Sequence, residues 1–233
     1  MPARYAPRVS TETMPEGTNT ATVPLIFPIG QQVGARYQAD QILAAQQVRC
    51  GGRFHDLTEQ QAEVWRLAHG VPEEIDRQIP WQRGSVEERL PAAGPIIDEL
   101  TRLGLLVEVT PGTAQAEEFA NAHRLVPLML GLGNSATDTD TYGIGFLSQP
   151  VLQVSYPIYD VWQWSTMDDS LWNTCENATD VARRAGSTDL EATETSRLLT
   201  GIVGSLHALL ASSAAYLDVG FRLNWPAGTG PAV

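Results

Sequence analysis

The chain has 233 residues and a mass of 25.3 kDa, enough for one large domain or two small ones with separate cores. Its 15 basic residues, all arginine, and its 27 acidic residues give a formal net charge of −12 at pH 7. A chain with this much negative charge repels the phosphate backbone of nucleic acids, which disfavours general binding to them. Cys50 and Cys175 lie far apart with no Cys or His cluster beside them, which excludes a sequence-evident zinc site and a disulfide scaffold. The absence of lysine, with abundant Ala, Gly and Arg, is typical of a high-GC bacterial source.

Two segments bear on targeting and on membranes. Residues 1–22 are rich in Pro, Ser, Thr and Glu and lack the apolar stretch of a secretory signal, so they are predicted to form a flexible arm. Residues 198–217 are uncharged and long enough to cross a bilayer, but they contain Ser, Thr and His207, and their Leu and Ile positions follow a helical period. This pattern favours a buried core or interface helix. We therefore expect a cytoplasmic protein with no membrane association.

The first predicted elements are a β-hairpin and a helix. Residues 47–57 contain two short strand-like runs on either side of Gly51-Gly52, which predicts a two-residue hairpin turn. Thr58 and Gln61 have the spacing of a capping box, in which each side chain binds the other residue's amide. The helix that starts there is predicted to end at Gly70 in the left-handed conformation.

Two further helices and a strand are predicted to complete this unit. Pro72, followed by two glutamates, is typical of the first position of a short helix. The third helix is expected over residues 94–104 and the strand over residues 105–109. Four apolar residues define the core face of the third helix: Ile96, Ile97, Leu100 and Leu103.

The middle of the chain is predicted to connect this unit to a second one. Residues 114–129 have the apolar spacing of a connecting helix, and residues 131–141 are predicted to form a polar linker. Residues 151–164 are β-branched and aromatic and contain an internal proline, so they predict two strands that meet at a turn. Trp162 and Trp164 would then share one strand face.

The remaining residues predict a second set of helices. Ser165 or Thr166 is expected to cap a helix that ends at Asn177, and Thr179 is expected to cap a short helix after it. A long helix and a closing strand, over residues 199–210 and 216–219, complete the pattern.

The two sets of elements suggest an internal duplication. Trp65 and Trp172 are separated by nearly the same number of residues as Leu100 and Leu206. The fold class predicted is α+β, with two tandem, pseudo-duplicated winged-helix-like units, each a short β-hairpin plus three helices. The expected organisation is an arm, a first unit, a connecting helix and linker, a second unit and a C-terminal tail, over residues 1–22, 23–112, 113–141, 142–220 and 221–233.

Groups that carry chemistry are sparse. The histidines lie at no metal-ligand spacing, and adjacent carboxylates point in different directions on a helix. Cys50 has arginines nearby, which favour the thiolate, but no partner base is evident and we interpret it as a structural strand cysteine. We assign no catalytic residue, metal ligand or cofactor. The four histidines are His55, His69, His123 and His207.

The order of elements in the first unit resembles the PqqD-like leader-peptide recognition modules. The resemblance is carried by VRCGGRFHDL, TEQQAEVWRLAHG, VPEEIDRQI and IIDELTRLGLLVEV, within residues 46–109, and more faintly by residues 151–219. It implies a non-catalytic domain that captures a precursor peptide as an added strand, in a groove between the hairpin edge and the third helix. In that reading Arg49 and Arg53 select acidic side chains. The implied peptide-binding residues are Val48, Arg49, Arg53, Phe54, Ile97 and Thr101.

The function predicted is a peptide- or protein-binding adaptor in a bacterial pathway that modifies ribosomally made peptides, with a precursor peptide or a modifying enzyme as partner. The long helix over residues 198–217 could support a homodimer. Two alternatives stay open. The first is a winged-helix transcription regulator or its antagonist, although the third helix carries Asp98 and Glu99 where a DNA-binding helix is basic. The second is an enzyme with its site between the units, using Cys50, His55, His207 and the linker.

Overall fold

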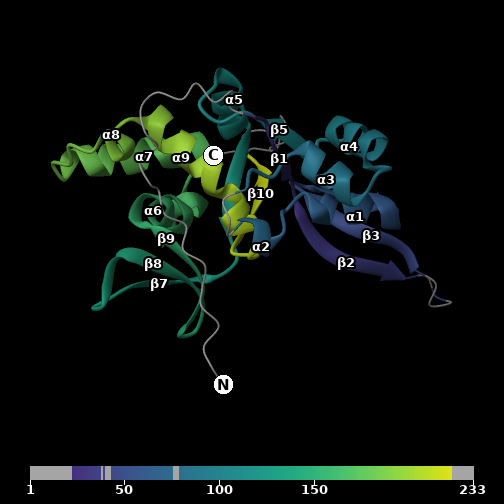
Figure 1. Ribbon diagram of the computed structural model, residues 1–233, viewed down its shortest axis with the longest axis horizontal. Helices are drawn as coiled ribbons and strands as arrows, with labels where there is room; N and C mark the ends of the chain where they lie inside the picture. The colour runs from purple at the N-terminus through teal and green to yellow at the C-terminus, as the bar shows by residue number, and fades with distance from the viewer. Residues whose placement is uncertain (1–22, 38, 40–42, 76–78, 222–233) are drawn as a thin grey trace, which may run out of the picture.

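The computed structural model describes residues 23–37, 39, 43–75 and 79–221 (Figure 1). The predicted flexible arm and most of the predicted tail lie outside the described residues. The described chain combines helices with small antiparallel sheets, which confirms the predicted α+β class.

The first half of the chain contains a three-stranded meander followed by helices. Strands β2, β3 and β4 pair in sequence order, and β5 returns to pair antiparallel with β1, with Leu25 opposite Val109. Helix α1 follows β4 directly. The elements are β1 (Leu25–Pro28), β2 (Gln31–Tyr37), β3 (Leu43–Cys50), β4 (Arg53–Leu57), α1 (Glu59–Leu67), α2 (Pro72–Ile75), α3 (Arg83–Arg89), α4 (Ala93–Arg102) and β5 (Leu106–Val109).

The second half has a comparable arrangement. Strands β7, β8 and β9 form a second antiparallel meander, and β10 pairs antiparallel with β6, with Val219 opposite His123. Figure 1 shows the two meanders on opposite sides of the central strands β1, β5 and β10. The elements are α5 (Ala114–Ala122), β6 (His123–Pro127), β7 (Leu130–Ser135), β8 (Asp138–Phe146), β9 (Gln149–Ser155), α6 (Tyr156–Trp164), the 3-10 turn η1 (Ser165–Met167), α7 (Leu171–Arg184), α8 (Leu190–Thr193), α9 (Thr195–Ala211) and β10 (Ala215–Val219).

Both halves follow the order strand, meander, helices and closing strand, but the residues correspond differently from the sequence prediction. Helix α1 follows the first meander and α6 follows the second, so Trp65 matches Trp162, whereas Trp172 lies in α7. The indole Nε1 of Trp65 donates to the Ile29 oxygen at 3.2 Å, and the indole Nε1 of Trp162 donates to the Ala214 oxygen at 3.0 Å. The pairing of Trp65 with Trp172 is therefore wrong.

The last helices of the two halves also match at residues different from those predicted. The Leu105 amide donates to the Leu100 oxygen at 2.9 Å, and the Ala214 amide donates to the Leu209 oxygen at 2.8 Å. Leu100 thus matches Leu209, about one helical turn beyond the predicted Leu206.

The local signals of the first half are confirmed. Cys50 pairs with Arg53 across the turn, and the capping box of Thr58 and Gln61 has both of its hydrogen bonds. Pro72 is the first residue of α2. Helix α3 is an additional helix that the sequence pattern does not indicate, because its seven residues carry a single buried apolar side chain.

The prediction of two strands over residues 151–164 is wrong beyond Ser155. Tyr156–Trp164 forms helix α6, with Pro157 in its first turn, where the lack of an amide hydrogen is harmless and the fixed φ is helical. The proline therefore starts a helix instead of separating two strands. Trp162 is buried, whereas Trp164 is exposed, so the two rings do not share a face.

The predicted connecting helix and linker are also only partly correct. Helix α5 ends at Ala122, where the chain turns into strand β6 and pairs with β10. Residues 131–141, expected as a linker, belong to the β7–β8 hairpin, in which Ser135 pairs with Asp138. Their polar and glycine-rich composition reflects exposed strands instead of an absence of structure.

Helix α7 begins and ends later than predicted. Its N-cap is Ser170, whose hydroxyl accepts from the Asn173 amide at 3.2 Å, and not Ser165 or Thr166. The helix continues through Asn177 to Arg184, and Thr179, expected as a cap, is a buried mid-helix residue.

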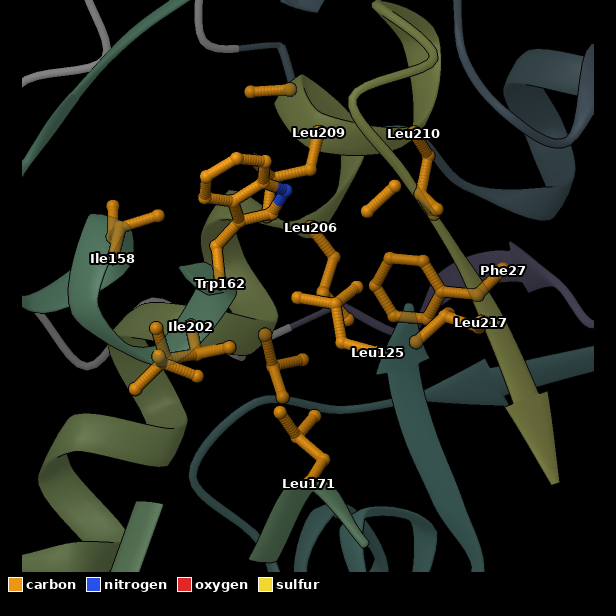
Figure 2. Packing of buried hydrophobic residues seen from close by; sticks show 14 of the residues in the cluster. Phe27, Leu125, Ile158, Trp162, Leu171, Ile202, Leu206, Leu209, Leu210 and Leu217 are labelled. Carbon is orange, nitrogen blue, oxygen red and sulfur yellow. The ribbon is translucent and has the colours of Figure 1, made fainter. Parts of the chain in front are cut away.

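Two hydrophobic cores meet at strand β1. Ile26 contributes to the small core beside α1, α3 and α4, whereas Leu25 and Phe27 contribute to the large core around α9. This division follows from the alternation of side chains along a strand. Figure 2 shows Phe27 near Leu217 and Leu125, with Trp162 and Leu206 deeper in the large core.

Helix α9 confirms the prediction of a buried helix. Most of its apolar side chains are buried in the large core, including Leu199, Ile202, Leu206 and Leu210. Among the described residues, no helix is both long and apolar enough to span a membrane.

Candidate functional site

The β3–β4 hairpin is the place where the structure gathers several of the predicted site residues. Arg49 lies directly opposite Phe54, next to the Cys50–Arg53 pair that closes the turn. Strand β3 is the middle strand of its sheet, and β4 is a terminal strand paired on one side. Within this hairpin, the edge available to an added strand therefore lies on β4, not along the whole span from Val48 to Phe54.

The six predicted residues do not share one surface. Phe54 is 63% exposed, and Arg49, Arg53 and Thr101 are exposed as well. Val48 and Ile97 are 1% and 0% exposed and belong to the same small core. A buried side chain cannot grip a peptide directly, so these two residues support the hairpin and α4 from beneath.

The helix beside the hairpin is also different from the one expected. Helix α1 packs against β3 and β4, whereas α4, which bears Thr101, packs against α1, α3 and β5. A groove along the β4 edge would therefore use α1 as its nearer helix.

The main chain of β4 offers hydrogen-bonding groups on its outer side. Cys50 and Arg53 close a two-residue turn, and such a closing pair exchanges hydrogen bonds. Because antiparallel pairing alternates, the main-chain groups of Phe54 and Asp56 face away from β3.

Some charged side chains around the hairpin form ion pairs and others do not. The Asp56 carboxylate accepts from the side-chain Nε2 of Gln47 at 2.7 Å and from Arg36 Nη2 at 2.5 Å. These hydrogen bonds lower the pKa of Asp56. Arg49 and Arg53, by contrast, form no ion pair with any residue that the structure describes. The hairpin thus presents unpaired positive charge in an acidic protein.

A buried carboxylate from the second half holds the hairpin turn. Asp218 on β10 accepts from the Gly51 amide at 2.6 Å and lies 3.5 Å from Arg124 Nη2 on β6. The Arg124 guanidinium in turn lies 3.8 Å from the ring centroid of Phe221. Sequence reasoning missed Asp218 and Arg124, because each is a single charge in a strand and their pairing appears only when β6 meets β10.

Cys50 does not have the properties of a nucleophile. Burial raises the pKa of its thiol to about 11, and the nearby Asp218 carboxylate adds to the effect. This outweighs the neighbouring arginines, so the protonated thiol dominates at neutral pH. Burial likewise raises the pKa of Cys175 to about 12.

The residues considered for an enzyme site have separate partners. His207 Nε2 lies 2.8 Å from the Ile26 oxygen, and the His207 ring stacks on Phe27 with centroids 4.6 Å apart. Burial lowers the pKa of His207 to about 4. His55 lies opposite Val48, two positions from the Cys50 pair. Within the described ranges, no group of three or more His, Cys, Asp or Glu side chains is placed to hold a metal ion.

The described surface contains two hollows of similar size. One, of about 390 Å³, lies against the β7–β8–β9 sheet and is lined by Asn134, Asp138 and Gln153 among others. The other, of about 370 Å³, lies where the two halves meet, between α1, the start of β2 and the α9–β10 connection.

Comparison of the chain with protein-family models, with curated proteins and with solved structures finds no match.

Proposed function

We propose that the chain is a non-catalytic adaptor that binds an extended peptide along the outer edge of β4. The observation that carries this proposal is a terminal strand with an exposed Phe54 and with Arg49 and Arg53 outside any described ion pair. A peptide that pairs with such an edge gains main-chain hydrogen bonds, and its side chains are selected by neighbouring groups. The arginines favour an acidic peptide, and Phe54 offers an apolar contact.

The β4 edge is a better template than the edge of the second meander. Strand β9 contains Pro150, which has no amide hydrogen, and proline at a sheet edge opposes pairing with another chain. Strand β4 contains no proline. We therefore place the proposed peptide site at β4 and not at β9.

We also propose that each half is a winged-helix-like unit and that the first resembles the PqqD-like leader-peptide recognition modules. The order of a meander, a capped helix, further helices and a strand supports this reading. The physiological ligand is then the leader segment of a ribosomally made precursor peptide, captured for a modifying enzyme in a bacterial cytoplasm.

The test uses the full chain and a fluorescein-labelled peptide of alternating Glu and Val, followed by fluorescence anisotropy. We expect saturable binding with one peptide per chain. The matched peptide of alternating Lys and Val should bind poorly, and methylation of alternate peptide nitrogens should abolish binding because it removes main-chain donors.

Variants locate the binding surface. Arg49→Gln and Arg53→Gln should each weaken binding by about 0.2–1 kcal/mol, the range for exposed ion pairs, while Arg102→Gln on α4 should leave it unchanged. Equal affinity for the N-methylated peptide would show that β4 pairing is not the mode of binding. Equal affinity for the Lys peptide would show that the arginines do not select acidic peptides.

A further inference from the structure

The cleft between the two halves has the size of a small-ligand site and a lining that mixes polar and apolar groups. Its volume of about 370 Å³ lies within the usual range of such sites. Leu128, which is 40% exposed, is an accessible apolar side chain of its lining. Gln31, His69 and Tyr216 contribute polar groups from three different segments of the chain.

The charge of this cleft is opposite to that of the protein. Arg66 is its lining cation, and the lining residues include no Asp or Glu. Arg66 Nε donates to the Ala62 oxygen at 3.2 Å, and the side chain forms no ion pair with any described residue. A cation left unpaired beside a hollow in a chain of net charge −12 favours an anionic occupant.

Neighbouring groups do not reverse that charge. Arg49 lies opposite Gln31 in the β2–β3 pairing, which adds a second cation near the cleft. The Asp218 carboxylate raises the pKa of Tyr216, but it already accepts from the Gly51 main-chain amide and lies beside Arg124.

His69 forms a neutral wall of the cleft. Its Nδ1 lies 3.2 Å from the Trp65 oxygen and 3.1 Å from the Arg66 oxygen, and since carbonyl oxygens only accept, Nδ1 carries the hydrogen. The ring packs edge-on against Trp65, with centroids 4.6 Å apart. Burial lowers the pKa of His69, so the ring is uncharged at neutral pH.

We propose that this cleft binds a small carboxylate with a short apolar tail. The carboxylate pairs with the Arg66 guanidinium, and the tail packs against Leu128, which is exposed in the cleft. This site is separate from the β4 edge and does not depend on peptide binding there.

Hexanoate is the probe, titrated into the ¹⁵N-labelled full chain at neutral pH while amide chemical shifts are followed. We expect saturable shifts at Gly70, Ala211 and Ser213, which line the cleft. Arg66→Gln should weaken hexanoate binding by about tenfold or more, because it removes the charge-assisted hydrogen bonds. Arg102→Gln, on exposed α4, is the matched control and should bind hexanoate as the wild type does.

Two further ligands test the roles of the carboxylate and of the tail, and the peptide affinity of Arg66→Gln separates this site from the β4 edge. Hexan-1-ol should bind more weakly than hexanoate and be insensitive to Arg66→Gln, and inorganic phosphate, which lacks a tail, should bind more weakly than hexanoate. Unsaturable shifts, shifts outside the cleft, or equal hexanoate affinity in Arg66→Gln would overturn the proposal. Arg66→Gln should keep wild-type affinity for the Glu–Val peptide, so failure at one site is distinguishable from failure at the other.

Discussion

At the scale of single residues, Asp218 is the group on which the two halves most directly depend. Its carboxylate meets both the turn of the β3–β4 hairpin and the partly buried Arg124, whose Nε has no hydrogen-bond partner among the described residues. A charge kept from water in this way is costly when its partner is removed. Asp218 thus joins the stability of the fold to the position of the proposed peptide edge.

Asp218→Asn should lower the free energy of unfolding by about 2–4 kcal/mol, because it leaves the Arg124 charge without its carboxylate. Urea unfolding followed by circular dichroism measures this loss. The control is Asp98→Asn, which breaks the exposed pair of Asp98 with Arg83 and should cost about 1 kcal/mol or less. Similar losses in the two variants would contradict a special role for Asp218.

At the scale of elements, sequence reasoning succeeds where the signal is local. The Gly51-Gly52 turn and the capping box of Thr58 depend on residues a few positions apart, so their chemistry is visible in the sequence. Helix α6 was missed because its β-branched and aromatic residues match a strand composition, and only packing in the large core decides in favour of a helix.

The candidate site was predictable to a similar extent. The hairpin with Arg49, Arg53 and Phe54 follows from local sequence, but the identity of the edge strand depends on β2, which no turn signal announces. The burial of Ile97 and the cleft beside Arg66 depend on contacts between segments distant in sequence. Neither can be derived from periodicity alone.

The start of helix α7 provides a test at this scale. Ser170→Ala should destabilise the protein by about 1 kcal/mol, because the hydroxyl accepts from the Asn173 amide at 3.2 Å and the amide would lose that partner. Thr166→Ala, at the exposed position predicted earlier as a cap, should change stability by less than about 0.5 kcal/mol. Thermal and urea unfolding of both variants would measure the two losses of stability. A larger loss in Thr166→Ala than in Ser170→Ala would favour Thr166 as the N-cap.

At the scale of the whole molecule, strand β1 and helix α9 unite the two halves into one packed body. Phe27 packs in the large core with the residues of α9, and His207 of α9 reaches back to the main chain of β1. The proposed peptide edge lies on β4, in the first half, whereas the proposed carboxylate cleft lies at the junction itself, beside the start of β2 and the α9–β10 connection. A change that loosens the junction should therefore affect the cleft more than the edge, because only the cleft has walls from both halves.

Acid is the condition that should loosen this junction, through His207. Burial lowers its pKa in the folded chain from 6.5 to about 4. Below pH 6.5 the unfolded chain therefore binds a proton that the folded chain refuses, so stability present above that pH is lost as the pH falls toward 4. The loss from this residue should approach ~3 kcal/mol. Urea unfolding across this range measures it, and His207→Gln should reduce the slope of stability against pH. An unchanged slope in His207→Gln would assign the acid sensitivity to other groups, such as the half-buried His69 and His123, whose pKa values burial also lowers.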